Sequence, residues 1–211
     1  MNRGLFITFE GPDGSGKTTQ IKMLAQHCAE RGFDVVLTRE PGGTPISEKI
    51  RNIILDPGNI EMAGTTEALL YAASRAQHVS QLIIPSIEQG RIVLCDRFVD
   101  SSIAYQGFAR GLGDGVRVIN EFATLGIRPD LTFFFDVDPE TAHARNVASG
   151  KSDRLELEAI EFHKKVYEGY KQAAEAEPGR FRVIDASEPA EAVFRAVKAA
   201  FDKYVAEADK N

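Results

Sequence analysis

Short apolar runs alternate with amphipathic segments along the whole chain. The apolar runs lie at residues 5–9, 34–38, 92–95, 131–137 and 181–184, and the run at 131–137 is apolar at nearly every position. Runs of this kind are typical of strands that are buried on both faces of a parallel sheet. Between them, apolar residues recur at helical spacing, as in segments 46–55 and 66–87. The pattern predicts an α/β fold in which a five-stranded parallel sheet lies between two layers of helices.

The length of the chain and its charge indicate how many domains it forms and which partners it disfavours. The chain has 211 residues, which is enough for one domain with a full core, and no linker, repeat or low-complexity tract divides it. Its formal net charge is −6. A negative protein is a poor partner for nucleic acid, because nucleic-acid-binding proteins usually present a basic face. We therefore expect a single domain, residues 1–211, that binds any phosphate in a local positive pocket.

The sequence shows neither a membrane span nor a secretion signal. No apolar run approaches the ~20 residues that cross a bilayer, and no signal-peptide apolar region precedes the first predicted strand. Cys28 and Cys95 fall in a predicted helix and a predicted buried strand, where we expect reduced thiols. These features predict a cytoplasmic protein with no membrane partner.

The most informative stretch follows the first predicted strand and precedes an amphipathic helix. It reads Gly11-Pro12-Asp13-Gly14-Ser15-Gly16-Lys17-Thr18-Thr19 and matches the phosphate-binding pattern G-x-x-x-x-G-K-[ST]. Glycines let the backbone N–H groups turn toward phosphate oxygens, and the helix N-terminus adds unpaired donors. The lysine reaches the terminal phosphates and the first threonine offers its hydroxyl to Mg²⁺. We predict a P-loop nucleoside-triphosphatase fold, a three-layer sandwich whose residues 11–19 bind a nucleoside triphosphate.

Charged residues follow two further predicted strands. Arg39 and Glu40 precede the turn at residues 41–44, and Asp96 and Arg97 follow the strand at 92–95. Because the carboxyl ends of parallel strands share one edge of a sheet, these side chains are expected to face the phosphate loop. A carboxylate at such a place handles Mg²⁺ or its water shell, and a guanidinium can hold a phosphate with two hydrogen bonds. From spacing alone, merely solvated charges in the turns remain an alternative.

The predicted helix at 66–87 carries an aromatic residue and an arginine on one face. Tyr71 and Arg75 are four residues apart, so their side chains are neighbours. A ring and a planar guanidinium suit a nucleobase, which could stack on one and accept a hydrogen bond from the other. Ordinary packing of such a pair is the alternative interpretation.

The segment at about 146–158 is typical of a mobile lid. It is small, charged and contains a glycine, and it lies between two helical patterns. A lid would exclude water from a triphosphate before the terminal phosphoryl group is transferred. Arg145, Lys151 and Arg154 are the candidate cations that would close over the phosphates, and an exposed linker with incidental charges is the alternative.

Together these motifs resemble the bacterial thymidylate kinases. The similarity extends from the first predicted strand to the last predicted helix, and the combination of Pro41-Gly42-Gly43 with Asp96-Arg97-Phe98 is specific to that family. The resemblance implies that the chain transfers the γ-phosphoryl group of ATP to dTMP with Mg²⁺, giving ADP and dTDP in the dTTP synthesis pathway. It also favours a homodimer, for which the long helix at 66–87 offers an apolar face.

The resemblance implies roles for individual residues. Lys17, Asp96, Arg97 and Arg154 would be the catalytic groups, and Thr18 and Asp96 would bind Mg²⁺. The ATP contacts would come from residues 11–19. Tyr71 would stack on thymine, at a position where the family often has phenylalanine. Some relatives have more arginines in the lid than this chain, which has Arg145, Lys151 and Arg154. The predicted dTMP-binding residues are Asp13, Glu40, Arg51, Tyr71, Arg75, Arg97, Ser102, Tyr105 and Gln106.

Two alternatives belong to other functional classes. Another small phosphate-loop kinase, acting on a deoxynucleoside or a different monophosphate, would differ only in the few residues that select the base. A regulatory nucleotide-binding switch is the second alternative. The sequence lacks the guanine-reading pattern Asn-Lys-x-Asp, and a switch has little use for a second basic pocket or a lid.

Overall fold

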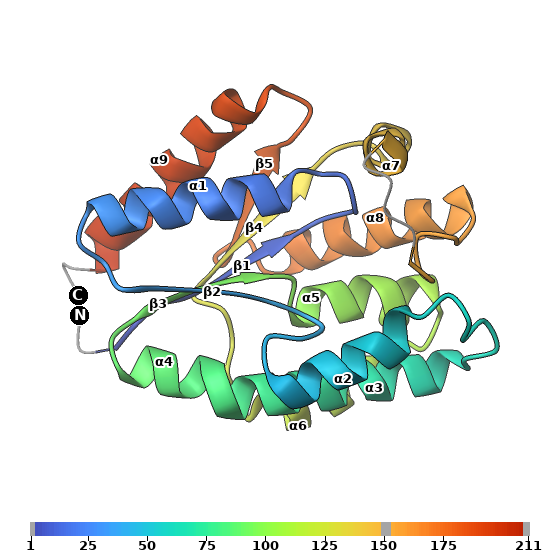
Figure 1. Cartoon of the computed structure of the whole chain (residues 1–211). Coiled ribbons are helices and arrows are strands. Elements are labelled where there is room, and N and C mark those ends of the chain that lie inside the picture. Colours follow the sequence, from blue (N-terminus) through green and yellow to red (C-terminus); the bar gives the residue numbers. More distant parts are fainter. Residues whose placement is uncertain (1–2, 149–152, 209–211) are drawn as a thin grey trace.

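The computed structural model of the chain describes residues 3–148 and 153–208. Its centre is a parallel sheet in the order β2-β3-β1-β4-β5 (Figure 1). The strands are β1 (Phe6–Glu10), β2 (Val35–Arg39), β3 (Ile92–Asp96), β4 (Leu131–Asp136) and β5 (Phe181–Asp185). The five-stranded parallel sheet predicted from the sequence is therefore confirmed, with each strand end within one residue of its predicted position.

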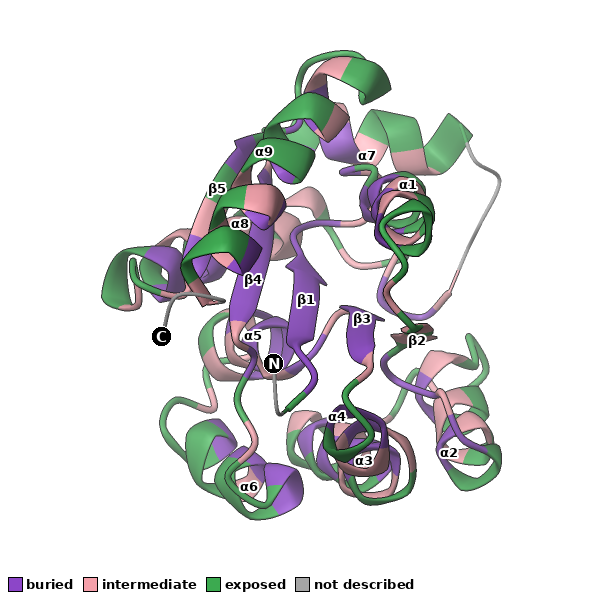
Figure 2. Ribbon diagram, turned by 90° about the vertical axis from the view of Figure 1, so that its left-hand side faces the viewer, coloured by how far each residue is buried: buried purple, intermediate pink, exposed green. Residues whose placement is uncertain are grey.

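Helices cover both faces of the sheet, which gives three layers (Figures 1 and 2). Helices α1 (Lys17–Glu30) and α9 (Ala190–Ala208) pack on one face, and α4 (Ile84–Glu88) and α8 (Ile160–Ala176) pack on the other. None of the described helices has the length and apolar character to cross a membrane. The others are α2 (Pro45–Leu55), α3 (Gly64–His78), α5 (Val99–Ser102), α6 (Gly115–Thr124) and α7 (Pro139–Ala148).

The continuous apolar runs reflect burial on both faces of the sheet. Successive strand side chains point to opposite faces, so Phe133 and Phe135 join the core beneath α1 and α9. Phe134, between them, packs against α8 on the other face. All three rings are almost completely buried, and most of the β4 ribbon has the colour of buried residues in Figure 2. A strand covered on one face alone would need polar residues at alternate positions.

The segment predicted as one helix at 66–87 is helical throughout but changes pitch. Helix α3 runs into a π-helical turn, Val79–Ile83, and then into α4. Pro85 has no N–H, so the carbonyl of Gln81 loses its usual partner and the wider turn takes up the change. A second π-helical segment, Ile103–Ala109, follows α5 and lies close to α8.

The register of the sheet brings three loops to one edge. Phe9 and Arg39 both pair with Asp96, from the strands on either side of β3. The phosphate loop after β1, the turn after β2 and the turn after β3 therefore start side by side. In parallel α/β sheets, ligands bind at this carboxyl edge.

Candidate active site

The phosphate loop is folded around its own lysine. Lys17 is buried, and its Nζ donates to the carbonyl oxygens of Gly11 and Pro12 at 2.9 and 2.7 Å. Gly14 has a φ of +84°, and a Cβ there would collide with the carbonyl of Ala142 in α7, so only glycine fits. The ammonium group of Lys17 thus holds the loop by its own backbone acceptors.

Burial makes the ammonium group of Lys17 easier to deprotonate. Loss of solvent, and then repulsion by Arg97, lower the pKa of Lys17 to about 8.

For Asp13, in the same loop, neighbouring charges outweigh the effect of burial on the pKa. Partial burial would raise the pKa of Asp13, but the charges of Arg97 and Lys17 outweigh it and hold that pKa well below its usual value. Asp13 is therefore fully ionised at neutral pH.

The two predicted Mg²⁺ ligands are in direct contact. The Oγ1 of Thr18, in the first turn of α1, donates to Oδ2 of Asp96 at 3.0 Å. Asp96 ends β3 and Thr18 begins the helix after β1, so the pair bridges two neighbouring strand ends. Hydroxyl and carboxylate oxygens are the ligands that Mg²⁺ takes from proteins, together with water and phosphate. The residues present therefore fit the ion.

Arg97 links the phosphate loop to the rest of the site. Its φ is +71°, a left-handed conformation that is rare for a side chain of this size. The guanidinium donates to Oδ1 of Asp13 at 2.7 Å and to the carbonyl of Gly11 at 3.0 Å. It also donates to Oγ of Ser101 at 3.2 Å and to the hydroxyl of Tyr170 at 2.8 Å. Four partners from three parts of the chain thus fix one side chain.

Two cavities adjoin at Arg97. The larger, of about 510 Å³, lies over the phosphate loop, and its lining includes Lys17, Thr18, Asp96 and Arg145. The smaller extends beneath it. Their common wall consists of Asp13, Glu40, Arg51, Arg97 and Asp153. The predicted dTMP-binding residues that line the smaller cavity are Asp13, Glu40, Arg51, Tyr71, Arg97, Ser102, Tyr105 and Gln106.

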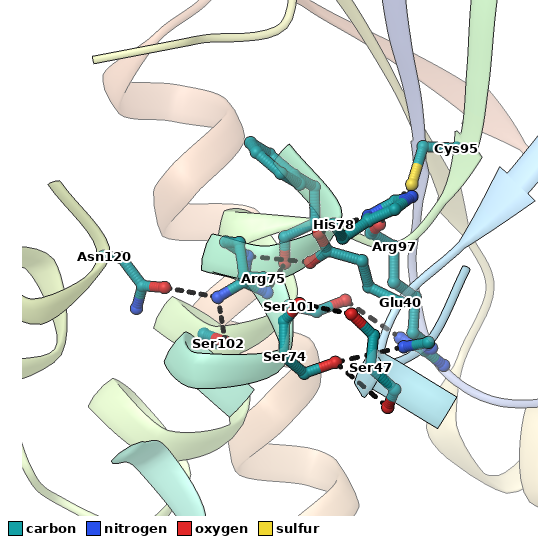
Figure 3. A network of polar contacts seen from close by, with 12 residues as sticks. Glu40, Ser47, Ser74, Arg75, His78, Cys95, Arg97, Ser101, Ser102 and Asn120 are labelled. Atoms are coloured by element: carbon teal, nitrogen blue, oxygen red, sulfur yellow. Dashed lines mark hydrogen bonds and ion pairs between the residues drawn. The ribbon is translucent and has the colours of Figure 1, made fainter. Parts of the chain in front are cut away.

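Arg75 is the predicted dTMP-binding residue that lies outside this lining. Its side chain is 1% exposed and donates to Oε2 of Glu40 at 2.7 Å, to Oγ of Ser102 at 3.0 Å and to the carbonyl of Phe98 at 3.0 Å (Figure 3). Asn120 accepts another bond from it. Four of its five N–H groups are therefore used by the protein, so at most one N–H remains for a base.

A family comparison agrees with this arrangement. The family model described as thymidylate kinase matches residues 9–197. The chain is 51% identical over 201 residues to a thymidylate kinase of Clostridium novyi, covering 94% of this chain and 98% of that protein. A thymidylate kinase of Finegoldia magna is 56% identical over 191 residues, with 90% and 94% covered. The chain belongs to the thymidylate kinase family.

A solved structure places the fold in the same family. The crystal structure of thymidylate kinase from Ehrlichia chaffeensis matches with a TM-score of 0.76 and 36% identity, covering 94% of this chain and 98% of that chain. The family resemblance that the motifs indicate is therefore confirmed, as is the three-layer α/β fold.

The lid of this thymidylate kinase family member differs from expectation at one cation. Arg154 is predicted to close over the phosphates, yet it is 6% exposed and does not line the phosphate-loop cavity. Its Nη2 donates to Oε2 of Glu67 at 2.6 Å and its Nε to the carbonyl of Ile54 at 2.9 Å. A buried carboxylate requires a cationic partner, and Arg154 serves Glu67 in that way. Its position gives no support to a catalytic role.

Of the other two predicted lid cations, one lies in the described part of the chain and one does not. Arg145, in α7, lines the phosphate-loop cavity while its guanidinium donates to the carbonyls of Ala186 and Ser187. Lys151 lies outside the described residues, as does part of the predicted lid at 146–158. Of the three predicted lid cations, Arg145 is therefore the one that lines the phosphate-loop cavity in the described part of the chain.

Several residues of the site were not singled out by the sequence. Glu67 is fully buried and accepts hydrogen bonds from Gln106, Arg110 and Arg154. Helical spacing could have indicated Glu67, because it precedes Tyr71 by four residues and so shares its face. Tyr170 comes from α8, and no spacing in the sequence connects that helix with Arg97.

Replacing Glu67 tests how much this buried carboxylate contributes to the stability of the fold. Burial would raise its pKa, but hydrogen bonds from Arg110, Gln106 and Arg154 lower it. We expect Glu67→Ala to reduce the free energy of unfolding in urea by about 3 kcal/mol, because it leaves a buried arginine unpaired. The exposed pair of Glu140 and Lys164 is the matched control. An equal loss on Glu140→Ala would contradict the assignment.

Proposed function

We propose that this chain transfers the γ-phosphoryl group of ATP to dTMP, giving dTDP and ADP. The observation that carries the proposal is the pair of adjoining cavities that meet at Arg97. A triphosphate on the phosphate loop and a monophosphate in the smaller cavity would bring their phosphates together at that guanidinium. Membership of the thymidylate kinase family supports the same reaction.

The smaller cavity is suited to a pyrimidine deoxynucleotide. Tyr71 lines it with an aromatic side chain, and Gln106 and Ser102 line it with polar groups. The hydroxyl of Tyr105 donates to Oδ2 of Asp13 at 3.2 Å, at the side of the cavity where the sugar would lie. In this proposal Arg75 acts mainly by orienting Ser102 and Glu40, which line the cavity. A single N–H of Arg75 is left for the exocyclic oxygen of thymine.

The reaction needs no strong general base. A monophosphate oxygen is already anionic at pH 7, so the protein must bring two negative groups into line and neutralise the charge that spreads between them. Lys17 would serve the donor phosphates and Arg97 the acceptor phosphate. The left-handed backbone of Arg97 and its four hydrogen bonds hold that guanidinium in place before substrates arrive.

Mg²⁺ is the expected cofactor. Thr18 and Asp96 would hold it at the phosphate-loop cavity, where their oxygen atoms already meet. Bound there, the ion would neutralise charge on the donor phosphates. Residues 146–158 would form the lid, with Arg145 and Lys151 as its cations toward the phosphates and Arg154 as the anchor of the segment to Glu67.

The cytoplasm is the location that we propose. Cys28 and Cys95 are both free and buried, and burial raises the pKa of both thiols, that of Cys28 to about 12. Protonated, unpaired thiols are typical of proteins in reducing compartments.

The reaction is tested by supplying ATP and Mg²⁺ together with one acceptor at a time and measuring the ADP that is formed. We expect a strong preference for dTMP over dUMP, dCMP, dGMP and thymidine, and Lys17→Ala should lose at least about a hundredfold in turnover because it removes a charge from the donor phosphates. Preference for thymidine would contradict the phosphate role of Arg97. Binding of ATP without turnover of any acceptor would favour a nucleotide switch instead.

Titration of Lys17 predicts how ATP binding depends on pH. With a pKa of about 8 in the free protein, the ammonium group loses its proton as pH rises further, and ATP binding must then restore it. We expect Kd for Mg·ATP to rise about tenfold per pH unit above pH 8. In Lys17→Arg, the guanidinium stays protonated, so its Kd should not change over that range. A wild-type profile as flat as that of the variant would refute the prediction.

A homodimer through α3 and α6 is the assembly that we propose. These helices lie side by side, and their exposed apolar residues are Leu69, Val118, Phe122 and Leu125. Phe122 is 84% exposed, which is unusual for an aromatic ring in a monomer. We expect Phe122→Glu to reduce the mass measured by light scattering from twice 23.2 kDa to 23.2 kDa. Val183→Glu, on β5, should leave the dimer intact; dissociation by both variants or by neither would argue against this surface.

A further inference from the structure

Glu10 is a buried carboxylate that has no part in the reaction as described above. It is the last residue of β1, directly before the phosphate loop, and it has no exposed surface. Its Oε1 accepts a hydrogen bond from the backbone N–H of Phe98 at 2.7 Å. Its Oε2 accepts from the hydroxyls of Ser101 at 2.6 Å and Tyr170 at 3.3 Å. These three donors come from the turn after β3, from α5 and from α8.

The same two hydroxyls contact the guanidinium of Arg97. Its Nη1 lies 3.2 Å from Oγ of Ser101 and 2.8 Å from the hydroxyl oxygen of Tyr170. A hydroxyl has one proton to donate. The two hydroxyl oxygens also lie 2.7 Å apart. When Ser101 donates to the ionised carboxylate, Tyr170 donates to Ser101 or to the carboxylate, and both hydroxyl oxygens are left to accept from Arg97. The ionised Glu10 therefore sets the direction of the hydrogen bonds between it and the guanidinium.

We propose that Glu10 is a positioning residue for the acceptor phosphate, acting on Arg97 through Ser101 and Tyr170. The inference rests on the proposed function, in which Arg97 holds the phosphate of dTMP. The N–H of Phe98 adds a second restraint, because it fixes the backbone immediately after the left-handed Arg97. Glu10 thus restrains both the main chain and the side chain of the residue at which the two cavities meet.

Protonation of Glu10 would reverse this arrangement. A neutral carboxyl group donates one hydrogen bond to Ser101 or Tyr170. The hydroxyl proton of that residue then turns toward the other hydroxyl oxygen, 2.7 Å away, and that oxygen must accept from it as well as from Arg97. The guanidinium would share this acceptor and lose the nearby negative charge, and with them part of its fixed orientation. A weaker hold on the acceptor phosphate follows.

The charges around Glu10 place this protonation near neutral pH. Burial, and then the charge of Asp100 in α5, raise the pKa of Glu10 to about 7, although Ser101 and Arg97 act against them. Asp100 is itself paired with Arg180 at 2.7 Å. The other titratable groups facing Glu10 are Tyr170 from α8, Lys17 from α1 and Cys95 from β3.

Glu10→Gln tests the proposal with binding and kinetics together. The amide keeps the size of the side chain but must donate from its nitrogen, so it imitates the protonated acid at every pH. We expect KM for dTMP and Kd for dTMP by calorimetry to rise about tenfold at pH 8, with KM for ATP changed less than twofold. In the wild type the KM for dTMP should rise as pH falls from 8 to 6, and the variant should lack the step near pH 7.

The phosphate of dTMP also gains a proton in this range, at a pKa of about 6. That change affects both proteins equally, so the difference between the two pH profiles reports Glu10 alone. Thr8→Val is the matched control, because Thr8 lies on the same face of β1 and is equally buried. Within the described part of the chain, the side chain of Thr8 bonds to the hydroxyl of Thr132 at 2.8 Å and does not contact Arg97. This variant should leave both KM values and the pH profile unchanged.

Tyr170→Phe provides an independent test if Glu10→Gln folds poorly. It removes the hydroxyl between Glu10 and Arg97 but keeps the ring that stacks on Phe134. We expect a smaller rise in KM for dTMP and a reduced pH step. Equal losses for ATP and dTMP in Glu10→Gln, or an unchanged pH step in both variants, would overturn the proposal. Absence of dTMP turnover in the wild type would instead refute the proposed function.

Discussion

The ion pair between Arg97 and Asp13 is the contact on which the site depends. It joins the turn after β3 to the phosphate loop after β1, at 2.7 Å, and it stands in the wall that the two cavities share. The left-handed backbone of Arg97 is costly for a non-glycine residue, and it is what turns the guanidinium back toward Asp13. Partial burial of the pair strengthens the attraction relative to water. A local backbone irregularity therefore shapes the wall that the two cavities share.

A second set of buried charges supports the acceptor cavity from behind. Arg75 bonds to Glu40, which also contacts Nδ1 of His78 at 2.9 Å (Figure 3). The Nε2 of that ring contacts the hydroxyl of Thr38 at 2.7 Å. Removing one member of a buried ionic network leaves its partners unpaired, which is more damaging than the loss of one contact. Arg75→Ala would therefore disturb folding as well as base selection, so it is a poor test of the latter.

The sheet and the phosphate loop of the candidate site could be predicted from the sequence because both follow from local patterns. Strands buried on two faces are apolar throughout, and the glycine-lysine motif requires a strand before it and a helix after it. The resemblance to a family then added residues such as Arg51, which spacing alone would not have indicated. The contacts of Glu10 with Tyr170 and of Glu67 with Arg154 span 160 and 87 residues. Such contacts depend on how helices pack over the sheet, and no periodicity in the sequence records that. The same limit explains Arg154, whose charge suggested a mobile cation although its packing makes it an anchor.

Glu67 accepts hydrogen bonds from a residue that lines the acceptor cavity, Gln106, and from a residue of the lid segment, Arg154. A ligand that displaced Gln106 would leave Glu67 a stronger acceptor for Arg154, and a movement of Arg154 would do the same for Gln106. Since coupling between two sites is reciprocal, occupancy of the smaller cavity and the placement of the segment that holds Arg154 would then be coupled. The residue that joins them would be Glu67, in the first half of α3.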